Sequence, residues 1–313
     1  MRNFMQHTLA QPIKCDGISL HQGAHVTMTL HPAPEHFGIW FKRTDIAKAE
    51  HALIKADVHN VVDTRLCTVL ENAYGVRVST VEHVMAALWG SGIDNVLIEI
   101  DGSEVPVMDG SSEPFMFLIE CVGVVAQDAP RAMLKVLKTV TVRDGDSVAT
   151  IAPCDDGFML DVDIMFAHQA IGAQRYSFDA TETTFKQSLS RARTFGFYHE
   201  VEAMRAAGLA RGGSLHNAVV INEEGIMNHD GLRYHDECVR HKALDCIGDY
   251  FLTGMRFLAH VTTSRPGHNI NNALMRALLA QSDAWIVVQE HDAFVPAHMV
   301  HAAQSLGVSA IIS

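Results

Sequence analysis

The stretch of sequence that decides the fold is STVEHVMAALWGSGIDNVLIEI, residues 79–100. Its first part has the apolar spacing of a short helix that ends at a Gly-Ser-Gly segment, with Thr80 as the expected N-cap. Its last part alternates, as a strand with one buried face does. A second unit of helix, glycine and strand, ECVRHKALDCIGDYFLTGMRFLAHVTT, occupies residues 237–263. The repetition predicts two similar halves, each a β-sheet with helices on one face, although α+β domains also reuse such pieces by chance.

Strand pairs precede both units. Residues 14–32 have the pattern strand, turn, strand, and residues 136–153 repeat it around an Asp-Gly turn. Residues 125–130 are the best linker candidate between the two patterns. We therefore expect an α+β protein with a first domain over residues 1–126 and a second domain over residues 131–313.

The end of the chain continues the mixture of helices and strands. After the second unit we expect a loop over residues 264–269 and a helix over residues 271–280. A strand over residues 285–289 and a closing helix over residues 298–305 complete the expected order.

The composition is that of a globular protein. The chain has 313 residues, of which 48% are hydrophobic and 19% charged, enough for a sizeable core. Lys and Arg number 24 and Asp and Glu 36, so the net charge of 24 − 36 = −12 disfavours nucleic-acid binding. No apolar run reaches the roughly 18 residues of a transmembrane helix. The six cysteines form no C-x-x-C pair and are expected as reduced thiols in a cytosol.

The helices of the two repeated units carry a candidate metal site. His241, Asp245 and Asp249 recur at i, i+4 and i+8 and therefore share one helix face. Glu82 and His83 stand at the start of the other helix. Two histidines and one aspartate leave a coordination position open, as in a catalytic rather than a structural zinc site. Each motif alone is more typical of a solvated helix face or an ordinary histidine, so the prediction depends on their combination.

Acid–base groups accompany this candidate site. Glu82, beside a ligand, is a candidate general base, and His268 is a candidate general acid with Asp249 as its orienting partner. Two histidines and a carboxylate also form the facial triad of Fe(II) oxygenases, which is the first alternative. A zinc-stabilised binding protein without activity is the second alternative, but it needs a fourth ligand that these motifs do not supply.

Five blocks of the sequence resemble those of the UDP-3-O-acyl-N-acetylglucosamine deacetylases, in the same order and at the same spacing. They are STVEH at 79–83, MDGS at 108–111, SRARTFGF at 190–197, VRHKALD at 239–245 and GHN at 267–269. The resemblance covers nearly the whole chain. It implies two similar α+β domains, each a helix layer on a sheet, with the active site between the helix layers.

The resemblance also implies an activity. Members of this family are zinc-dependent hydrolases of lipid A biosynthesis in Gram-negative bacteria, and they remove acetate from UDP-3-O-(3-hydroxyacyl)-N-acetylglucosamine. The expected partner is therefore a UDP-linked acylated amino sugar and not a nucleic acid. We expect a monomer in the cytoplasm, peripheral to the inner face of the membrane.

Several site residues follow from the same resemblance. It implies His83, His241 and Asp245 as ligands of zinc, with Fe(II) as the alternative metal. It also implies that Thr194 donates its hydroxyl to the developing oxyanion and that Lys242 faces the nucleotide diphosphate.

The implied acid–base roles agree with the interpretation of the residues themselves. Glu82 is the general base, and His268 is the general acid whose ring Asp249 holds. Because Glu82 must be ionised and His268 protonated, a bell-shaped pH profile is expected.

The family also has an insert that forms a passage for the acyl chain, and residues 198–222 match it here. The residues implied along this passage are Phe195, Leu209, Ala210, Gly213 and Ser214. Three positions depart from the family's usual residues: Arg65 replaces an apolar residue, Gln169 a proline and His216 an acidic residue. None is an implied metal ligand, so the departures concern substrate contacts rather than the chemistry.

Overall fold

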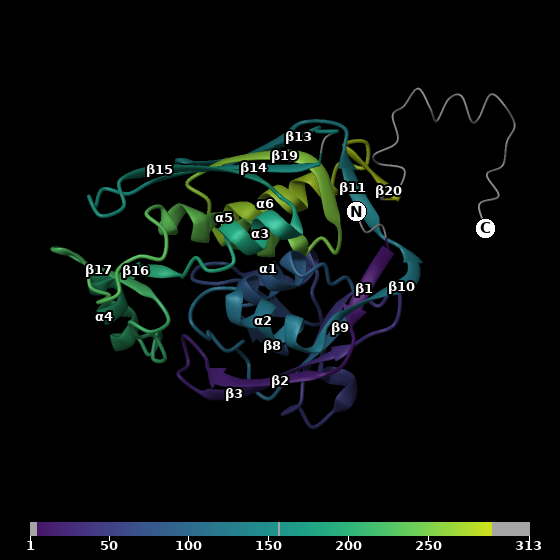
Figure 1. Cartoon of the computed structure of the whole chain (residues 1–313), viewed down its shortest axis with the longest axis horizontal. Helices are drawn as coiled ribbons and strands as arrows, with labels where there is room; N and C mark the ends of the chain where they lie inside the picture. Colours follow the sequence, from purple (N-terminus) through teal and green to yellow (C-terminus); the bar gives the residue numbers. More distant parts are fainter. Residues whose placement is uncertain (1–4, 156, 290–313) are drawn as a thin grey trace, which may run out of the picture.

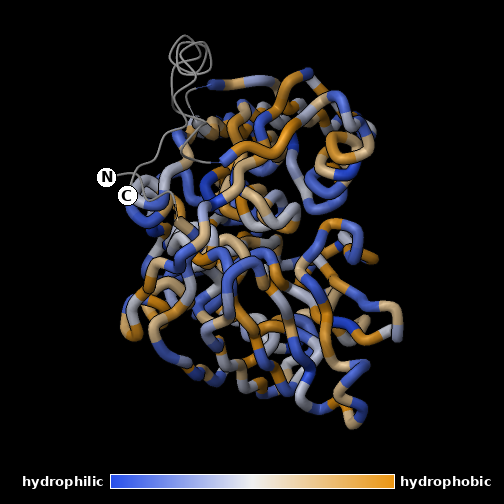
Figure 2. Tube along the Cα trace, turned by 90° about the vertical axis from the view of Figure 1, so that its right-hand side faces the viewer, coloured by the Kyte–Doolittle hydropathy of each residue, from blue (hydrophilic) through white to orange (hydrophobic). Residues whose placement is uncertain are grey.

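The computed structural model describes residues 5–155 and 157–289 of the chain. Two β-sheets lie on the outside of the molecule, and two layers of helices lie between them (Figure 1). Hydrophobic segments occur in both halves of the molecule (Figure 2). The structure therefore confirms the expected α+β class.

The first sheet has five strands in the spatial order β2-β3-β9-β4-β5. Its central strand β9 pairs antiparallel with β3 and parallel with β4. Alternate residues of β9 are buried, which is the pattern predicted for a strand with one face on a core. The strands span Ile13–Ile18 (β2), His25–Pro32 (β3), Val96–Ile100 (β9), Ile39–Arg43 (β4) and Leu53–Lys55 (β5).

The second sheet repeats the order and the directions of the first. Strand β19 pairs antiparallel with β13 and parallel with β14, as β9 does with β3 and β4. Two further strands, β11 and β20, extend this sheet. The strands span Val140–Asp144 (β12), Ser147–Ala152 (β13), Arg256–Ser264 (β19), Phe158–Met165 (β14), Ala173–Asp179 (β15), Ala132–Val136 (β11) and Trp285–Gln289 (β20). The repeated topology confirms the two similar halves.

The helices form the inner layers. In the first half α1 (Glu82–Gly90) and α2 (Glu113–Val122) lie on the first sheet (Figure 1). In the second half α3 (Glu182–Ser188), α5 (Glu237–Phe251) and α6 (His268–Leu279) lie under the second sheet. No helix of the described residues is both long and apolar enough to cross a membrane.

Smaller elements surround these layers. Helix α4 packs with β16 and β17 beside the two halves (Figure 1). Two short 3-10 helices lie before and after β5. The bounds are Tyr198–Ala206 (α4), Phe195–Phe197 (β16), Val219–Asn222 (β17), Gly225–Ile226 (β18), Met5–Leu9 (β1), Val124–Pro130 (β10), Val61–Asp63 (β6), Val69–Glu71 (β7), Arg77–Ser79 (β8), Ala49–His51 (η1) and Val58–Asn60 (η2).

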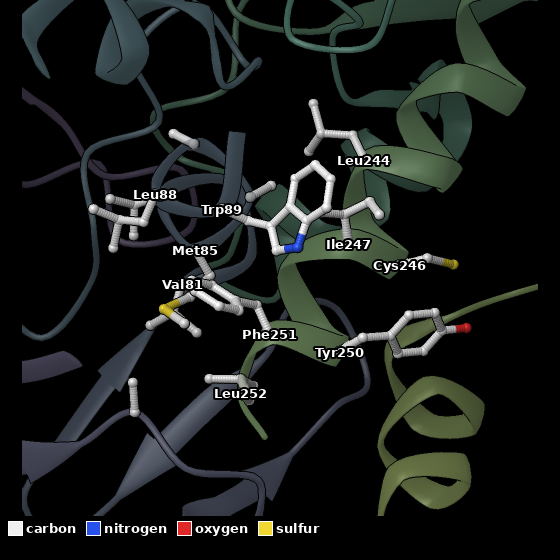
Figure 3. Packing of buried hydrophobic residues seen from close by; sticks show 14 of the residues in the cluster. Val81, Met85, Leu88, Trp89, Leu244, Cys246, Ile247, Tyr250, Phe251 and Leu252 are labelled. Carbon is white, nitrogen blue, oxygen red and sulfur yellow. The ribbon is translucent and has the colours of Figure 1, made fainter. Parts of the chain in front are cut away.

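The two halves meet where α1 packs on α5. Every residue of α1 is buried, because α5 covers the side of this helix that faces away from its own sheet. Trp89 of α1 lies beside Ile247 of α5 in this contact (Figure 3). A Cβ atom on Gly248 of α5 would lie 2.1 Å from the carbonyl oxygen of Glu82. The missing side chain of Gly248 thus allows the two helix backbones to touch at the first turn of α1.

Two local expectations need correction. Thr80 does not cap α1: its φ is 57°, its hydroxyl donates to Glu104, and Val81 holds the N-cap position without a side-chain bond. His268 is not in a loop, because α6 begins at this residue. Both residues make tertiary contacts that no local pattern shows, Thr80 with Glu104 and His268 with Asp249 of α5.

Other segments differ in smaller ways. The linker candidate, residues 125–130, lies in strand β10, which pairs with β1. The pattern analysis missed strands β14 and β15 and also helix α4, which has no buried residue and so no apolar stripe. The helix expected over residues 298–305 lies outside the described residues.

We predict that Gly248→Ala destabilises the fold by about 1–3 kcal/mol, because the added methyl must displace the backbone of α1. Helix propensity alone would make this substitution favourable by nearly 1 kcal/mol. Denaturant unfolding measures the difference. Gly196→Ala is the matched control, because its Cβ would meet only a Val201 methyl at an ordinary 3.7 Å. Equal or greater stability of the Gly248 variant would contradict the close contact.

Candidate metal centre and active site

The three predicted metal ligands meet at the contact between α1 and α5. His83 follows Glu82 at the start of α1, while His241 and Asp245 are one turn apart on α5. One ligand atom from each of these three buried side chains lies within 4.8 Å of the others. Asp245 Oδ1 is 3.3 Å from Nε2 of His241 and 3.7 Å from Nε2 of His83.

The donor set fits a divalent metal ion. Nδ1 of His241 lies 3.0 Å from the carbonyl oxygen of Ala192, which leaves Nε2 directed at Asp245. Lys242 donates to Asp245 Oδ2 at 3.0 Å. The other oxygen, Oδ1, is buried and accepts no hydrogen bond from the described residues. A buried carboxylate oxygen without a donor is costly, and a cation between it and the two imidazoles removes that cost.

The charges of these side chains suit metal binding. Burial, reinforced by His241, lowers the pKa of His83 to about 3, and burial also lowers the pKa of His241. Burial opposes ionisation of Asp245, but the neighbouring His241, Lys242 and His268 outweigh it and hold its pKa well below the usual range. Neutral imidazoles and an ionised carboxylate are the protonation states that bind a metal ion.

Glu82 lies beside this cluster, and each oxygen of its carboxylate has a neighbouring polar group. Oε2 accepts the backbone N–H of Thr68 at 3.1 Å, and Oε1 is 3.7 Å from Nε2 of His268. Burial raises the pKa of Glu82 to about 7, against the opposing effect of His268. A carboxyl group with such a pKa exchanges a proton readily at neutral pH.

His268 and Asp249 also come together as expected. Nδ1 of His268 is 2.9 Å from Asp249 Oδ2. Burial disfavours the imidazolium, but the charges of Asp249 and Glu82 outweigh it and raise the pKa of His268 to about 9. These charges favour a protonated imidazole at His268, and its Nε2 lies 3.7 Å from the carboxylate of Glu82.

Two further residues hold Asp249, and the sequence analysis did not find them. Asn271 donates to Asp249 Oδ2 at 2.8 Å, and the hydroxyl of Thr68 donates to Oδ1 at 2.6 Å. Asn271 stands three residues after His268 on α6, a helical spacing that could have suggested a shared role. Thr68 precedes a short strand and has no local signal of this kind.

Strand β16 lies beside one side of the cluster. The predicted site residues on this side are Thr194, Phe195 and Lys242. Thr194 precedes β16, and its backbone N–H donates to the carbonyl of Gly110 at 2.8 Å. The ammonium of Lys242 is 5.7 Å from the ring centre of Phe195 and also contacts Asp245. The same Phe195 ring lies 6.3 Å from the ring of His241, so it forms one wall beside the cluster.

A largely apolar hollow leads away from this wall, and we call it the side passage. It includes four of the five predicted passage residues, whereas Leu209 lines an adjacent hollow next to Arg65 and Cys67. Residues of the first half, Leu20 and His21, complete its wall. Thr194 and Met227 also line it.

The sequence analysis also did not identify His21 as a site residue. Both of its ring nitrogens are buried and have no hydrogen-bond partner among the described residues. The residue lines both the side passage and the adjacent hollow. Of the three departures, Arg65 pairs with Asp63 at 2.6 Å, and Gln169 and His216 are exposed.

Known proteins resemble this chain over most of its length. Residues 6–280 match the family model described as UDP-3-O-acyl N-acetylglycosamine deacetylase. A protein of this name from Cellvibrio japonicus (strain Ueda107) is 48% identical over 282 residues, which cover 90% of this chain and 92% of the relative. Relatives of the same name from Shewanella sp. (strain W3-18-1) and Idiomarina loihiensis are 46% identical, over 93% of this chain and 95% of each relative. The chain belongs to the UDP-3-O-acyl N-acetylglycosamine deacetylase family.

Proposed function

We propose that this protein is a zinc-dependent deacetylase of lipid A biosynthesis. It hydrolyses the N-acetyl group of UDP-3-O-(3-hydroxyacyl)-N-acetylglucosamine and releases acetate and the free amine. The observation that carries the proposal is the buried cluster of His83, His241 and Asp245 with Glu82 and His268 beside it. The names of the similar relatives supply the substrate.

His83, His241 and Asp245 would hold the zinc ion, and Fe(II) suits the same donors as an alternative. When bound, zinc supplies a Lewis acid that polarises a carbonyl group and makes water a stronger acid. The unpartnered oxygen of Asp245 and the orientation of His241 support this assignment.

The side chains around the cluster perform the proton transfers. Glu82 takes a proton from the attacking water, because its carboxylate is the group beside the cluster that titrates near pH 7. His268 donates a proton to the departing amine, and Asp249 holds its ring in place. Thr194 donates its hydroxyl to the oxyanion that develops from the acetyl carbonyl.

The remaining groups bind the substrate. The acyl chain enters the side passage along Phe195, Ala210, Gly213 and Ser214, with Leu209 at the adjacent hollow. The insert over residues 198–222 supplies most of these positions. Lys242, which is half-buried beside Phe195, provides the positive charge that faces the diphosphate.

The two halves act as domains over residues 1–126 and 131–313, with the site between their helix layers. One chain supplies every proposed ligand and acid–base group, which supports a monomer. All six cysteines are free thiols, which supports a cytoplasmic location. The apolar passage for a lipid chain supports peripheral contact with the inner face of the membrane.

The observations favour this hydrolase over both alternatives. An oxygenase has no use for a buried glutamate and a protonated histidine that are 3.7 Å apart beside the metal site. A structural zinc site needs a closed shell, and in the described part of the chain the cluster contains three ligands only.

Replacing the general base tests the mechanism. Glu82→Gln should lower kcat by about 10²–10⁴, because the amide cannot accept the proton from water. Acetate release from the UDP-linked substrate measures the rate, and the bound metal is quantified as the control. Near-full activity of this variant would show that another group is the base.

Removing the metal ion tests the hydrolase against the oxygenase. Chelator-treated protein should lose acetate release and regain it on addition of zinc, in the absence of oxygen. Metal-replete protein in the same anaerobic buffer is the control. A requirement for oxygen, or activity that survives complete chelation, would contradict the proposal.

The pH profile tests the role of Asp249. His268 keeps its proton below about pH 9, so activity should fall as the pH rises through that value. Asp249→Asn removes a charge that favours the imidazolium, so the alkaline limb should move to lower pH, while Glu82 and Asp245 still face the ring. The rate of acetate release against pH gives this limb. If the alkaline limb of the variant stayed at the wild-type pH, Asp249 would not be the residue that raises the pKa of His268.

A further inference from the structure

We propose that Thr68 is a positioning residue that holds the general base and the carboxylate behind the general acid in one ring, which three hydrogen bonds and one ion pair close. The inference rests on the proposed function, because it concerns how that reaction is organised. Thr68 itself points no group at the metal ligands and is not a proton donor in the reaction.

Thr68 reaches both sides of the acid–base machinery with two different atoms. Its backbone N–H donates to Oε2 of Glu82 at 3.1 Å. Its hydroxyl donates to Oδ1 of Asp249 at 2.6 Å. The residue is 1% exposed, so water does not compete for either bond.

His268 closes the ring from the opposite side. Its Nδ1 lies 2.9 Å from Asp249 Oδ2, and its Nε2 lies 3.7 Å from Glu82 Oε1. Each carboxylate thus uses one oxygen toward His268 and the other toward Thr68. The four residues come from α1, α5, α6 and the segment just before β7, so the ring joins the two halves of the molecule.

The hydroxyl of Thr68 decides the orientation of Asp249. Oδ2 of this buried carboxylate already accepts bonds from His268 and Asn271, whereas Thr68 is the donor found at Oδ1. Without that donor the carboxylate loses a strong bond to a charged acceptor and turns about its terminal torsion. A turned carboxylate directs the His268 ring away from the leaving group, which lowers the rate of proton donation without changing substrate contacts.

Two substitutions separate the hydroxyl from the shape of the side chain. Thr68→Val keeps the branched shape and the backbone N–H but removes the donor, whereas Thr68→Ser keeps the donor. We expect Thr68→Val to lower kcat about ten-fold or more with KM within about two-fold, and Thr68→Ser to keep kcat within about three-fold of wild type. Rates are expressed per bound metal ion, so that a change in metal content does not imitate the effect.

Controls distinguish positioning from general damage. Thr64→Val alters a half-buried threonine of the same segment and should leave kcat and KM unchanged. Unfolding midpoints identify variants that are merely unstable. If the valine variant does not fold, Thr68→Ala replaces it as the variant without a hydroxyl, and the comparison with serine is the same.

A double-mutant cycle tests whether Thr68 acts through Asp249. In the Asp249→Asn background, Thr68→Val should lower kcat by no more than about two-fold further. Effects that multiply in the double variant would overturn the proposal, as would a valine variant with wild-type kcat or a serine variant as impaired as valine. Failure of the proposed function is distinguishable from failure of the Thr68 proposal. In the former case the metal-replete wild-type protein would release no acetate.

Discussion

The close contact between α1 and α5 is the constraint on which the site depends. At Gly248 the space for a side chain is taken by the carbonyl oxygen of Glu82. The contact therefore brings the first turn of α1 against the face of α5 that carries His241 and Asp245. A bulkier residue at this crossing would separate His83 from its two partners, and among the described residues neither half contains a three-ligand cluster by itself.

Burial is what makes this cluster chemically useful. The same loss of solvent that lowers the pKa of His83 to about 3 raises that of Glu82 to about 7. At His268 the charges of Asp249 and Glu82 outweigh burial and raise the pKa to about 9. A group that accepts a proton and one that donates it are thereby available together at neutral pH, within 3.7 Å of each other. The cost of burying these charges is offset by mutual pairing, and a cation held by His83, His241 and Asp245 would offset it further.

The side passage also depends on the meeting of the two halves. The backbone N–H of Gly212 donates to the carbonyl of Leu20 at 2.9 Å, and that of Arg211 donates to the carbonyl of His21. A Cβ on Gly212 would lie 2.2 Å from the carbonyl oxygen of Ser19, so glycine is needed for this approach. The insert of the second half thus forms the passage wall together with a turn of the first. The candidate metal site and the side passage both form where the two halves meet.

The sequence by itself determined the repeated units, most helices, the central strands of both sheets and the shared helix face of His241 and Asp245, because these features follow from periodicities of two and of 3.6 residues. The resemblance to the family motifs then identified His83 and its neighbours as further candidate site residues. Only the tertiary structure decided that α6 begins at His268 and that Thr68 contacts Asp249, a residue 181 positions away in the chain. No local pattern encodes such a contact, since it arises from packing between helices and loops of different halves.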